Sequence, residues 1–224
     1  MWKYIFSLLL LAVVFSSSAQ TEEDLGLSED LFSLDSLSKY RIRSITVNYN
    51  LMRMAENVLD KPRTSNEINA EMNIHKFFIV ADFGTETTRR LDYSMDGTYW
   101  RAGLDVNLSS AWEEGQFIGL GLRYAQANFS DEGSVRRTLA DDSELLVNLS
   151  NDDITAQWAE LIFKIRGKIG GNIYTGYTMR YQFFLNYDPY PEALRPFDVP
   201  GYGKTRRPNS FQFDYYIGWR FSFK

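Results

Sequence analysis

The sequence predicts an all-β fold: an eight-stranded antiparallel up-and-down transmembrane β-barrel with short periplasmic turns and long outer loops. Three observations lead to this prediction. Apolar and polar residues alternate through segments of about 8–13 residues, which is near the length of a tilted membrane-spanning strand. Short and long connections alternate between these segments, and every proline falls in a long connection. Since proline cannot donate to a strand ladder, its distribution supports the strand assignments.

The first four segments set apolar residues against polar ones. Residues 44–51 alternate large apolar residues with serine, threonine and asparagine, and residues 67–74 alternate them with glutamate and asparagine. Residues 77–85 are less regular, because Phe78 and Val80 fall on the polar face. The fourth segment, 99–108, opposes tryptophan, leucine and valine to arginine, aspartate and asparagine. A period of two predicts a strand in each case.

The last four segments follow the same rule. Residues 117–125 oppose isoleucine and leucine to glycine and arginine, and residues 158–166 oppose leucine and phenylalanine to glutamate, lysine and arginine. Residues 173–185 oppose tyrosine, methionine and phenylalanine to threonine, arginine and glutamine. Residues 211–224 alternate without a break, and one face is almost entirely aromatic or large aliphatic. This C-terminal segment is the clearest strand in the chain.

The connections predict which end of the barrel faces the cell exterior. Residues 75–76, 109–115 and 167–172 form the short connections. Residues 52–66, 86–98, 126–157 and 186–210 form the long ones. Tight turns on the periplasmic side and longer loops outside are typical of outer-membrane barrels, so both termini are expected to be periplasmic.

The apolar faces are expected to contact lipid, and the polar faces to line the lumen. An eight-stranded barrel has room inside for little more than side chains, too little for the aromatic face of residues 211–224 and its neighbours. The alternative is a soluble lipocalin-like carrier with an apolar lumen. Aromatic residues near the predicted strand ends favour the membrane arrangement, in which they form interfacial belts. These residues are Trp100, Trp112, Phe117, Trp158, Trp219, Phe221 and Phe223.

The strand phases place six acidic and six basic side chains in the lumen. Because an isolated buried charge is costly, we expect these groups to pair and to fill the lumen. Their balance argues against an ion path, which usually carries one sign of charge in excess. The twelve residues are Glu67, Glu71, Asp82, Arg101, Asp105, Arg123, Glu160, Lys164, Arg166, Arg180, Asp214 and Arg220.

The N-terminal part of the chain divides into two expected segments ahead of the barrel at residues 40–224. Residues 1–19 have the features of a cleaved signal peptide: a basic start, an apolar run at 4–15 and small residues at the end. The alternative, a membrane anchor, is disfavoured because a spanning helix needs ~20 apolar residues. Residues 20–39 are acidic and serine-rich, and are expected to form a periplasmic tail.

Composition excludes several classes of function. The formal net charge is −5, and loss of Lys3 with the signal peptide makes it more negative, so nucleic acid is not expected as a partner. The absence of cysteine excludes disulfides, thiolate metal sites and thiol nucleophiles.

No catalytic, cofactor-binding or metal-binding residues are predicted. The sole histidine, His75, falls in a predicted periplasmic turn, whereas barrel hydrolases need a histidine at the outer rim. Asp141, Asp142, Asp152 and Asp153 match no calcium-loop spacing. We therefore predict that the protein is not an enzyme and needs no cofactor.

The C-terminal strand is similar to the assembly signal of outer-membrane barrels. Gly218, Phe221 and Phe223 match its glycine, apolar and aromatic positions, whereas Ile217 and Lys224 depart from it. This resemblance implies recognition by the barrel-assembly machinery.

Most of the chain also resembles an uncharacterised family, a domain of unknown function, of small outer-membrane β-barrels from Bacteroidota. The resemblance is carried by residues 99–107, 118–124 and, most specifically, 199–205. It implies an outer-membrane location and no known activity.

Three functions fit the sequence. The favoured one is a monomeric barrel in outer-membrane lipid, with a charge-filled closed lumen and a structural or interaction role through long surface loops, which would meet an unknown extracellular ligand. The alternatives are a narrow channel or small-solute binder, and an outer-membrane enzyme that uses carboxylates alone.

Overall fold

The computed structural model describes residues 41–59, 62–109, 116–138, 144–189 and 195–223. The expected signal peptide (1–19) and acidic tail (20–39) lie outside this part of the chain, as do Trp112, Asp141 and Asp142.

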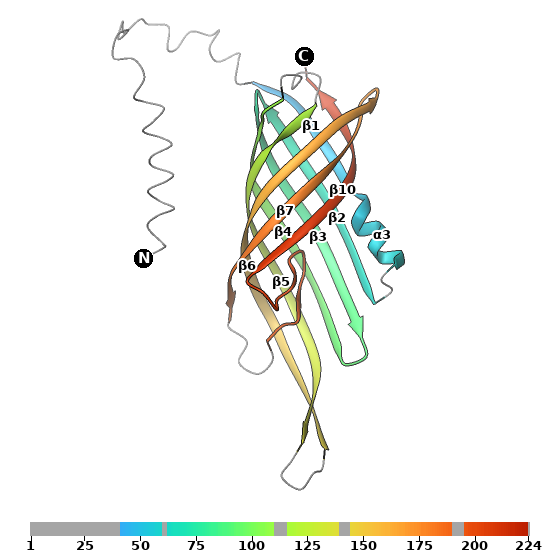
Figure 1. Cartoon of the computed structure of the whole chain (residues 1–224), viewed down its shortest axis with the longest axis vertical. Helices are drawn as coiled ribbons and strands as arrows, with labels where there is room; N and C mark the ends of the chain where they lie inside the picture. Colours follow the sequence, from blue (N-terminus) through green and yellow to red (C-terminus); the bar gives the residue numbers. More distant parts are fainter. Residues whose placement is uncertain (1–40, 60–61, 110–115, 139–143, 190–194, 224) are drawn as a thin grey trace, which may run out of the picture. The chain divides into compact units, whose positions relative to one another are not determined.

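Eight antiparallel strands close into a barrel, which confirms the predicted up-and-down fold (Figure 1). Each strand pairs with its neighbours along the chain, and the first strand pairs with the last. The strands are β1 (Ile42–Asn50), β2 (Arg63–Ile74), β3 (Phe77–Arg90), β4 (Tyr93–Asn107), β5 (Phe117–Thr138), β6 (Glu144–Gly170), β7 (Ile173–Asp188) and β10 (Asn209–Ser222).

Two smaller elements lie in the connections. The helix α3 (Leu51–Leu59) joins β1 to β2, and the short strands β8 (Asp198–Val199) and β9 (Gly203–Lys204) form a hairpin between β7 and β10. Among the described residues, no helix is long and apolar enough to cross a membrane.

The two ends of the barrel differ. At one end, which we call the terminal end, the chain enters β1 and leaves β10, and Ser44 pairs with Ser222. The turns at His75–Lys76 and Gly171–Asn172 lie at this end. The opposite end, which we call the hairpin end, carries α3, the β8–β9 hairpin and the extensions of β5 and β6, which project beyond the other strands (Figure 1).

Several strands run further toward the hairpin end than predicted. The expected long loop at 86–98 is wrong: β3 and β4 continue to a two-residue turn at Leu91–Asp92. The expected loop at 126–157 is largely the extended β5–β6 pair. In these extensions the contrast between faces no longer follows the predicted pattern: Met95, Phe129 and Ile154 are buried on the inward face, whereas Asp96 and Asn128 are exposed outside. The alternation of apolar outward and polar inward residues therefore stops before the strands end. Cross-strand polar contacts hold β3 to β4 instead, such as the Thr87 hydroxyl donating to Asp96 Oδ1 at 2.9 Å.

Side chains alternate between a charged interior and an apolar exterior. Arg101 and Asp105 on β4 are fully buried inside the barrel, whereas Leu122 on the neighbouring strand is 59% exposed outside it. Phe78 and Val80, which interrupt the alternation of β3, are both buried on the inward face. The exterior is thus the apolar surface of this molecule.

Two members of the expected aromatic belt lie elsewhere. Phe117 and Trp158 are completely buried, because both share the inward phase of their strands with charged lumen residues. Being at the end of a predicted strand was therefore not enough to place them at the rim. Four other expected members are exposed outside the barrel: Trp100, Trp219, Phe221 and Phe223.

Glycines on the inward face leave room for the charged side chains. A Cβ at Gly121 would overlap Asp105 Oδ1, and a Cβ at Gly218 would overlap Asn48 Oδ1. The lumen is therefore filled up to the backbone of its own wall at these positions.

We predict that Gly121→Val lowers the temperature of unfolding, measured by circular dichroism in detergent. The branched side chain would displace Asp105, and overpacking a filled interior typically costs about 1–3 kcal/mol. Gly167→Val is the matched control, since its Cβ would have nothing within 4 Å. Equal unfolding temperatures for the two variants would contradict a filled lumen.

Candidate functional site

Arg180 on β7 lies at the centre of the charged lumen. Its Nε atom lies 2.6 Å from Asp214 Oδ2, and its Nη1 atom lies 3.1 Å from Glu160 Oε2. Its Nη2 atom lies 3.3 Å from Glu67 Oε1, and Nη1 also lies 3.5 Å from Asp82 Oδ2. These acids come from four other strands, so one guanidinium connects opposite sides of the barrel.

Two further arginines pair with acidic residues of the lumen. Arg101 Nη1 donates to Glu67 Oε2 at 2.8 Å, and its Nε atom lies 2.9 Å from Glu160 Oε1. Arg123 donates through both terminal nitrogens to Asp105, at 2.5 and 2.8 Å. Such two-pronged pairs fix geometry as well as charge.

A second cluster fills the terminal end. The Glu71 carboxylate accepts hydrogen bonds from Lys164 Nζ and, at 2.6 Å, from Arg166 Nη1. The Arg166 guanidinium also lies over the rings of Phe78 and Phe117, at 5.3 and 5.7 Å from their centroids. Cation–π contacts of this kind are strongest where water is excluded.

The structure thus places all twelve predicted lumen residues inside the barrel and buries them. Eleven form ion pairs with one another. The exception is Arg220, which forms no ion pair with any described residue and lies 5.8 Å from the ring centroid of Tyr174.

Sequence reasoning missed three charged residues of the same network. Arg63 Nη2 lies 2.8 Å from Glu86 Oε1, and Arg53 of α3 lies 3.9 Å from both Glu67 and Glu86. These residues fall in segments that were predicted to be long loops. The inward phase of β2 and β3, continued past the predicted strand ends, would have identified Glu86.

Little free volume remains among these side chains. A cavity of about 20 Å³ lies between Asn48, Glu71, Lys164, Arg180 and other lumen residues. That is about the space of one water molecule. The carboxylates of the lumen acids accept hydrogen bonds from arginine and lysine side chains, as at Glu71 and Asp214. The arrangement therefore holds the charges in place and closes the lumen.

The β8–β9 hairpin inserts into the mouth of the barrel above these charges. The Gly201 carbonyl oxygen accepts three hydrogen bonds, from Arg101 Nη2 at 2.8 Å and from the side-chain amides of Gln182 and Gln212, each at 3.1 Å. The Gly201 amide donates to Glu86 Oε2 at 3.2 Å. Gly201 has a φ of 76°, a backbone conformation that favours glycine. A glycine at this position therefore suits the close contact between the hairpin backbone and the lumen side chains.

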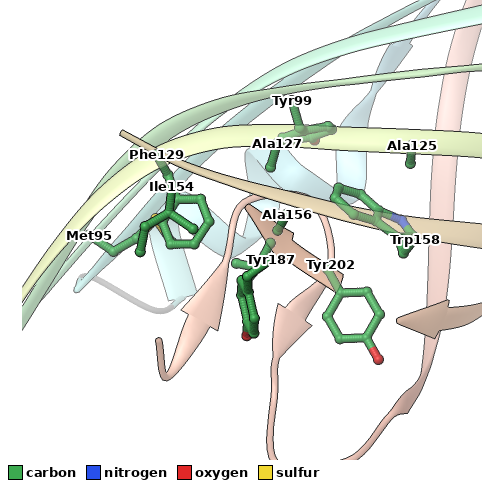
Figure 2. Close-up of a cluster of buried hydrophobic side chains, with 11 residues drawn as sticks. Met95, Tyr99, Ala125, Ala127, Phe129, Ile154, Ala156, Trp158, Tyr187 and Tyr202 are labelled. Atoms are coloured by element: carbon green, nitrogen blue, oxygen red, sulfur yellow. The ribbon is translucent and has the colours of Figure 1, made fainter. Parts of the chain in front are cut away.

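An apolar layer surrounds the inserted hairpin. Tyr202 lies edge-on to Trp158 and Phe184, with ring centroids 5.8 and 5.2 Å apart, and Figure 2 shows it beside Trp158 and Tyr187. Burial raises the pKa of the Tyr202 phenol to about 12. Val199 of the same hairpin is also fully buried. The mouth is therefore closed by the chain itself, through the segment 199–205 on which the family resemblance most depended.

The other predicted positions lie away from this site. Gly218 lies in the wall of β10, and Phe221 and Phe223 are exposed at the terminal end; their role in assembly stays a prediction. His75 lies in the β2–β3 turn at the same end. The described residues contain no group of three or more histidine, aspartate or glutamate side chains placed to hold a metal ion.

Comparison with known proteins gives a family without an assigned activity. The model of a family described as a domain of unknown function, DUF6048, matches residues 1–223. No curated protein and no solved structure matched the chain.

We predict that Arg180→Gln strongly destabilises the barrel, as measured by urea unfolding in detergent. Removing one partner of a buried ion pair typically lowers the free energy of unfolding by about 3–5 kcal/mol, and Arg180 forms ion pairs with four carboxylates. Arg220→Gln is the control, because Arg220 is also buried but forms no ion pair with a described residue. An equal loss of stability in both variants would show that pairing is not what holds the lumen.

Proposed function

The chain belongs to the DUF6048 family, a domain of unknown function, and we propose that it is an outer-membrane β-barrel with a closed lumen and a structural or interaction role. In this proposal it is a monomer, and its outward-facing hairpins contact partners outside the cell. The fold itself is shown; the location and the role of the hairpins are what we propose.

One observation carries the membrane location: the polarity of the barrel is inverted. Charged residues such as Glu160 are buried in the lumen, whereas large apolar residues such as Leu122 and Phe211 are 59% and 63% exposed. A soluble protein would bury the second set and expose the first. In a bilayer the same arrangement is favourable, since lipid contacts the apolar face and the sheet closes where β1 pairs with β10.

The closed lumen supports an interaction role over transport or catalysis. Ions crossing the barrel would have to displace both the Gly201 hairpin and the carboxylates bound to Arg180. Those carboxylates are engaged by cations, which leaves them poorly suited to act as general acids or bases. We therefore propose that the protein is neither a channel nor an enzyme.

The hairpin end offers the surface for an extracellular ligand or protein. Beyond Gly133, β5 pairs only with β6 among the described residues, so the two strands form a free-standing ribbon. Beside the base of the ribbon lies an open hollow of about 430 Å³, lined by residues 90–94, 132–134 and 148–150. Loops that project from a rigid scaffold commonly carry function.

At the terminal end we propose a different partner. Gly218 and the exposed Phe221 of β10, with the exposed Phe223 directly after the strand, would be recognised by the barrel-assembly machinery. This recognition would take place before the barrel closes against β1.

We predict that the purified protein floats with liposomes and changes its mobility on SDS gels after boiling, as closed membrane barrels do. An epitope tag inserted at the Leu91–Asp92 turn should be accessible to antibody on intact cells, because this turn lies at the hairpin end. A tag at the His75–Lys76 turn, at the opposite end, is the matched control and should be inaccessible.

Solubility without detergent, together with unchanged mobility on boiling, would rule out the membrane location. Antibody access at the His75–Lys76 turn alone would instead show that the barrel has the opposite orientation in the membrane to the one that we propose.

A further inference from the structure

The barrel wall has a gap at its hairpin end, because β1 is shorter than both of its neighbours. β1 ends at Asn50, opposite Tyr216 of β10. β2 begins at Arg63 and β10 at Asn209, so both continue past the end of β1. Along this stretch, β2 pairs only with β3 and β10 pairs only with β7 among the described residues.

The helix α3 lies beside β2 and β10 and covers this gap (Figure 1). The helix begins directly after β1, where Asn50 Oδ1 accepts hydrogen bonds from the Met52 and Arg53 amides at 3.1 and 3.2 Å. This cap fixes the direction in which the chain leaves the strand.

The polar face of α3 replaces the missing strand. The Asn57 side chain accepts a hydrogen bond from the Ser65 amide at 2.5 Å and donates one to the Ser65 carbonyl at 2.9 Å, so it satisfies one residue of the β2 edge. Arg53 extends through the gap into the lumen, where its Nη2 atom donates to Gln212 Oε1 at 2.9 Å. These contacts fix which face of the helix points inward.

The outward face of α3 is apolar, the reverse of a surface helix in a soluble protein. Leu51, Met54, Ala55 and Val58 recur at helical spacing, and Leu59 follows. Met54, Val58 and Leu59 are 53%, 73% and 84% exposed. This set carries no charge and no hydrogen-bonding group.

The apolar face continues into the exterior of the barrel. Phe211 and Phe213 on β10 and Ile68 on β2 are exposed on the two strands that flank the helix. On β2, the outward residues nearer the hairpin end are the polar Thr64 and Asn66. The helix therefore lies where the apolar exterior gives way to polar residues, as at the edge of a bilayer core.

We propose that the outward face of α3 is a lipid-docking surface, so that outer-leaflet acyl chains close the gap between β2 and β10 from outside. The inference rests on the proposed membrane location and adds that a loop expected to lie in water is part of the membrane-facing wall. A protein partner fits less well, since protein interfaces surround an apolar centre with a polar rim that these five residues do not supply.

The absence of cysteine in the chain permits a direct test. Met54→Cys and Val58→Cys would each be labelled with an environment-sensitive bimane and reconstituted in phosphatidylcholine vesicles with or without doxyl-labelled lipid. Leu122→Cys on the barrel exterior is the lipid-facing control, and Asp96→Cys, whose native side chain is 62% exposed on β4, is the water-facing control. The heat-dependent gel shift would verify that each labelled variant is folded.

We expect the two α3 labels and the Leu122 label to be quenched by doxyl lipid and protected from iodide, and the Asp96 label to show the reverse. Quenching at Leu122 but not on α3 would overturn this inference and leave the membrane location intact. Absence of lipid quenching at all four positions would overturn both. α3 labels protected from both quenchers, together with disulfide-linked dimers of the unlabelled Met54→Cys variant after treatment with a mild oxidant, would assign the surface to a second copy of the chain and overturn lipid docking.

Discussion

The barrel depends on the pairing of charges that its closed sheet removes from water. Arg180 contacts carboxylates from four other strands, and Arg101 and Arg123 bind several of the same acids or their neighbours. The desolvation cost of each group is offset only when its partners are in place. Because the partners come from different strands, the network stabilises one register and one closure of the sheet. A shift of a single residue would turn each charge on that strand toward the exterior.

This pairing also organises the mouth of the barrel. Arg101 binds Glu67 and Glu160 and still donates to the Gly201 carbonyl, so the inserted hairpin is attached directly to the charged layer. Gln212 connects the same carbonyl to Arg53 of α3, since its amide nitrogen donates to Gly201 and its oxygen accepts from Arg53. The hairpin above the lumen and the helix in the wall gap are therefore linked through one side chain. The elements that close the barrel form a connected set.

The sequence predicted the barrel and its inward residues wherever a strand has one apolar face and one polar face. A period of two can be detected only where the two faces of a strand differ in polarity. Around Thr87 both faces of β3 are polar, so this extension left no contrast to detect. On β4 the contrast is reversed, since Met95 is buried on the inward face and Asp96 is exposed outside. Trp158 shows a second limit of the sequence pattern. It lies on the same face of its strand as Glu160 and is buried in the barrel, but a tryptophan near a predicted strand end was expected at the membrane interface. The hairpin around Gly201 depends on contacts between residues far apart in the chain, which periodicity cannot reveal. The sequence analysis placed this segment only within the long connection at 186–210.

Conductance of the purified protein in planar lipid bilayers tests the central claim most directly, namely that paired charges and the inserted hairpin close the lumen. We predict no steady current for the wild-type protein, and none after residues 197–205 are replaced by a short glycine–serine linker, because the layer around Arg180 lies below the hairpin and remains paired. Stable, ion-selective currents from the wild-type protein would contradict this account. They would show that the charged residues line a path through the barrel.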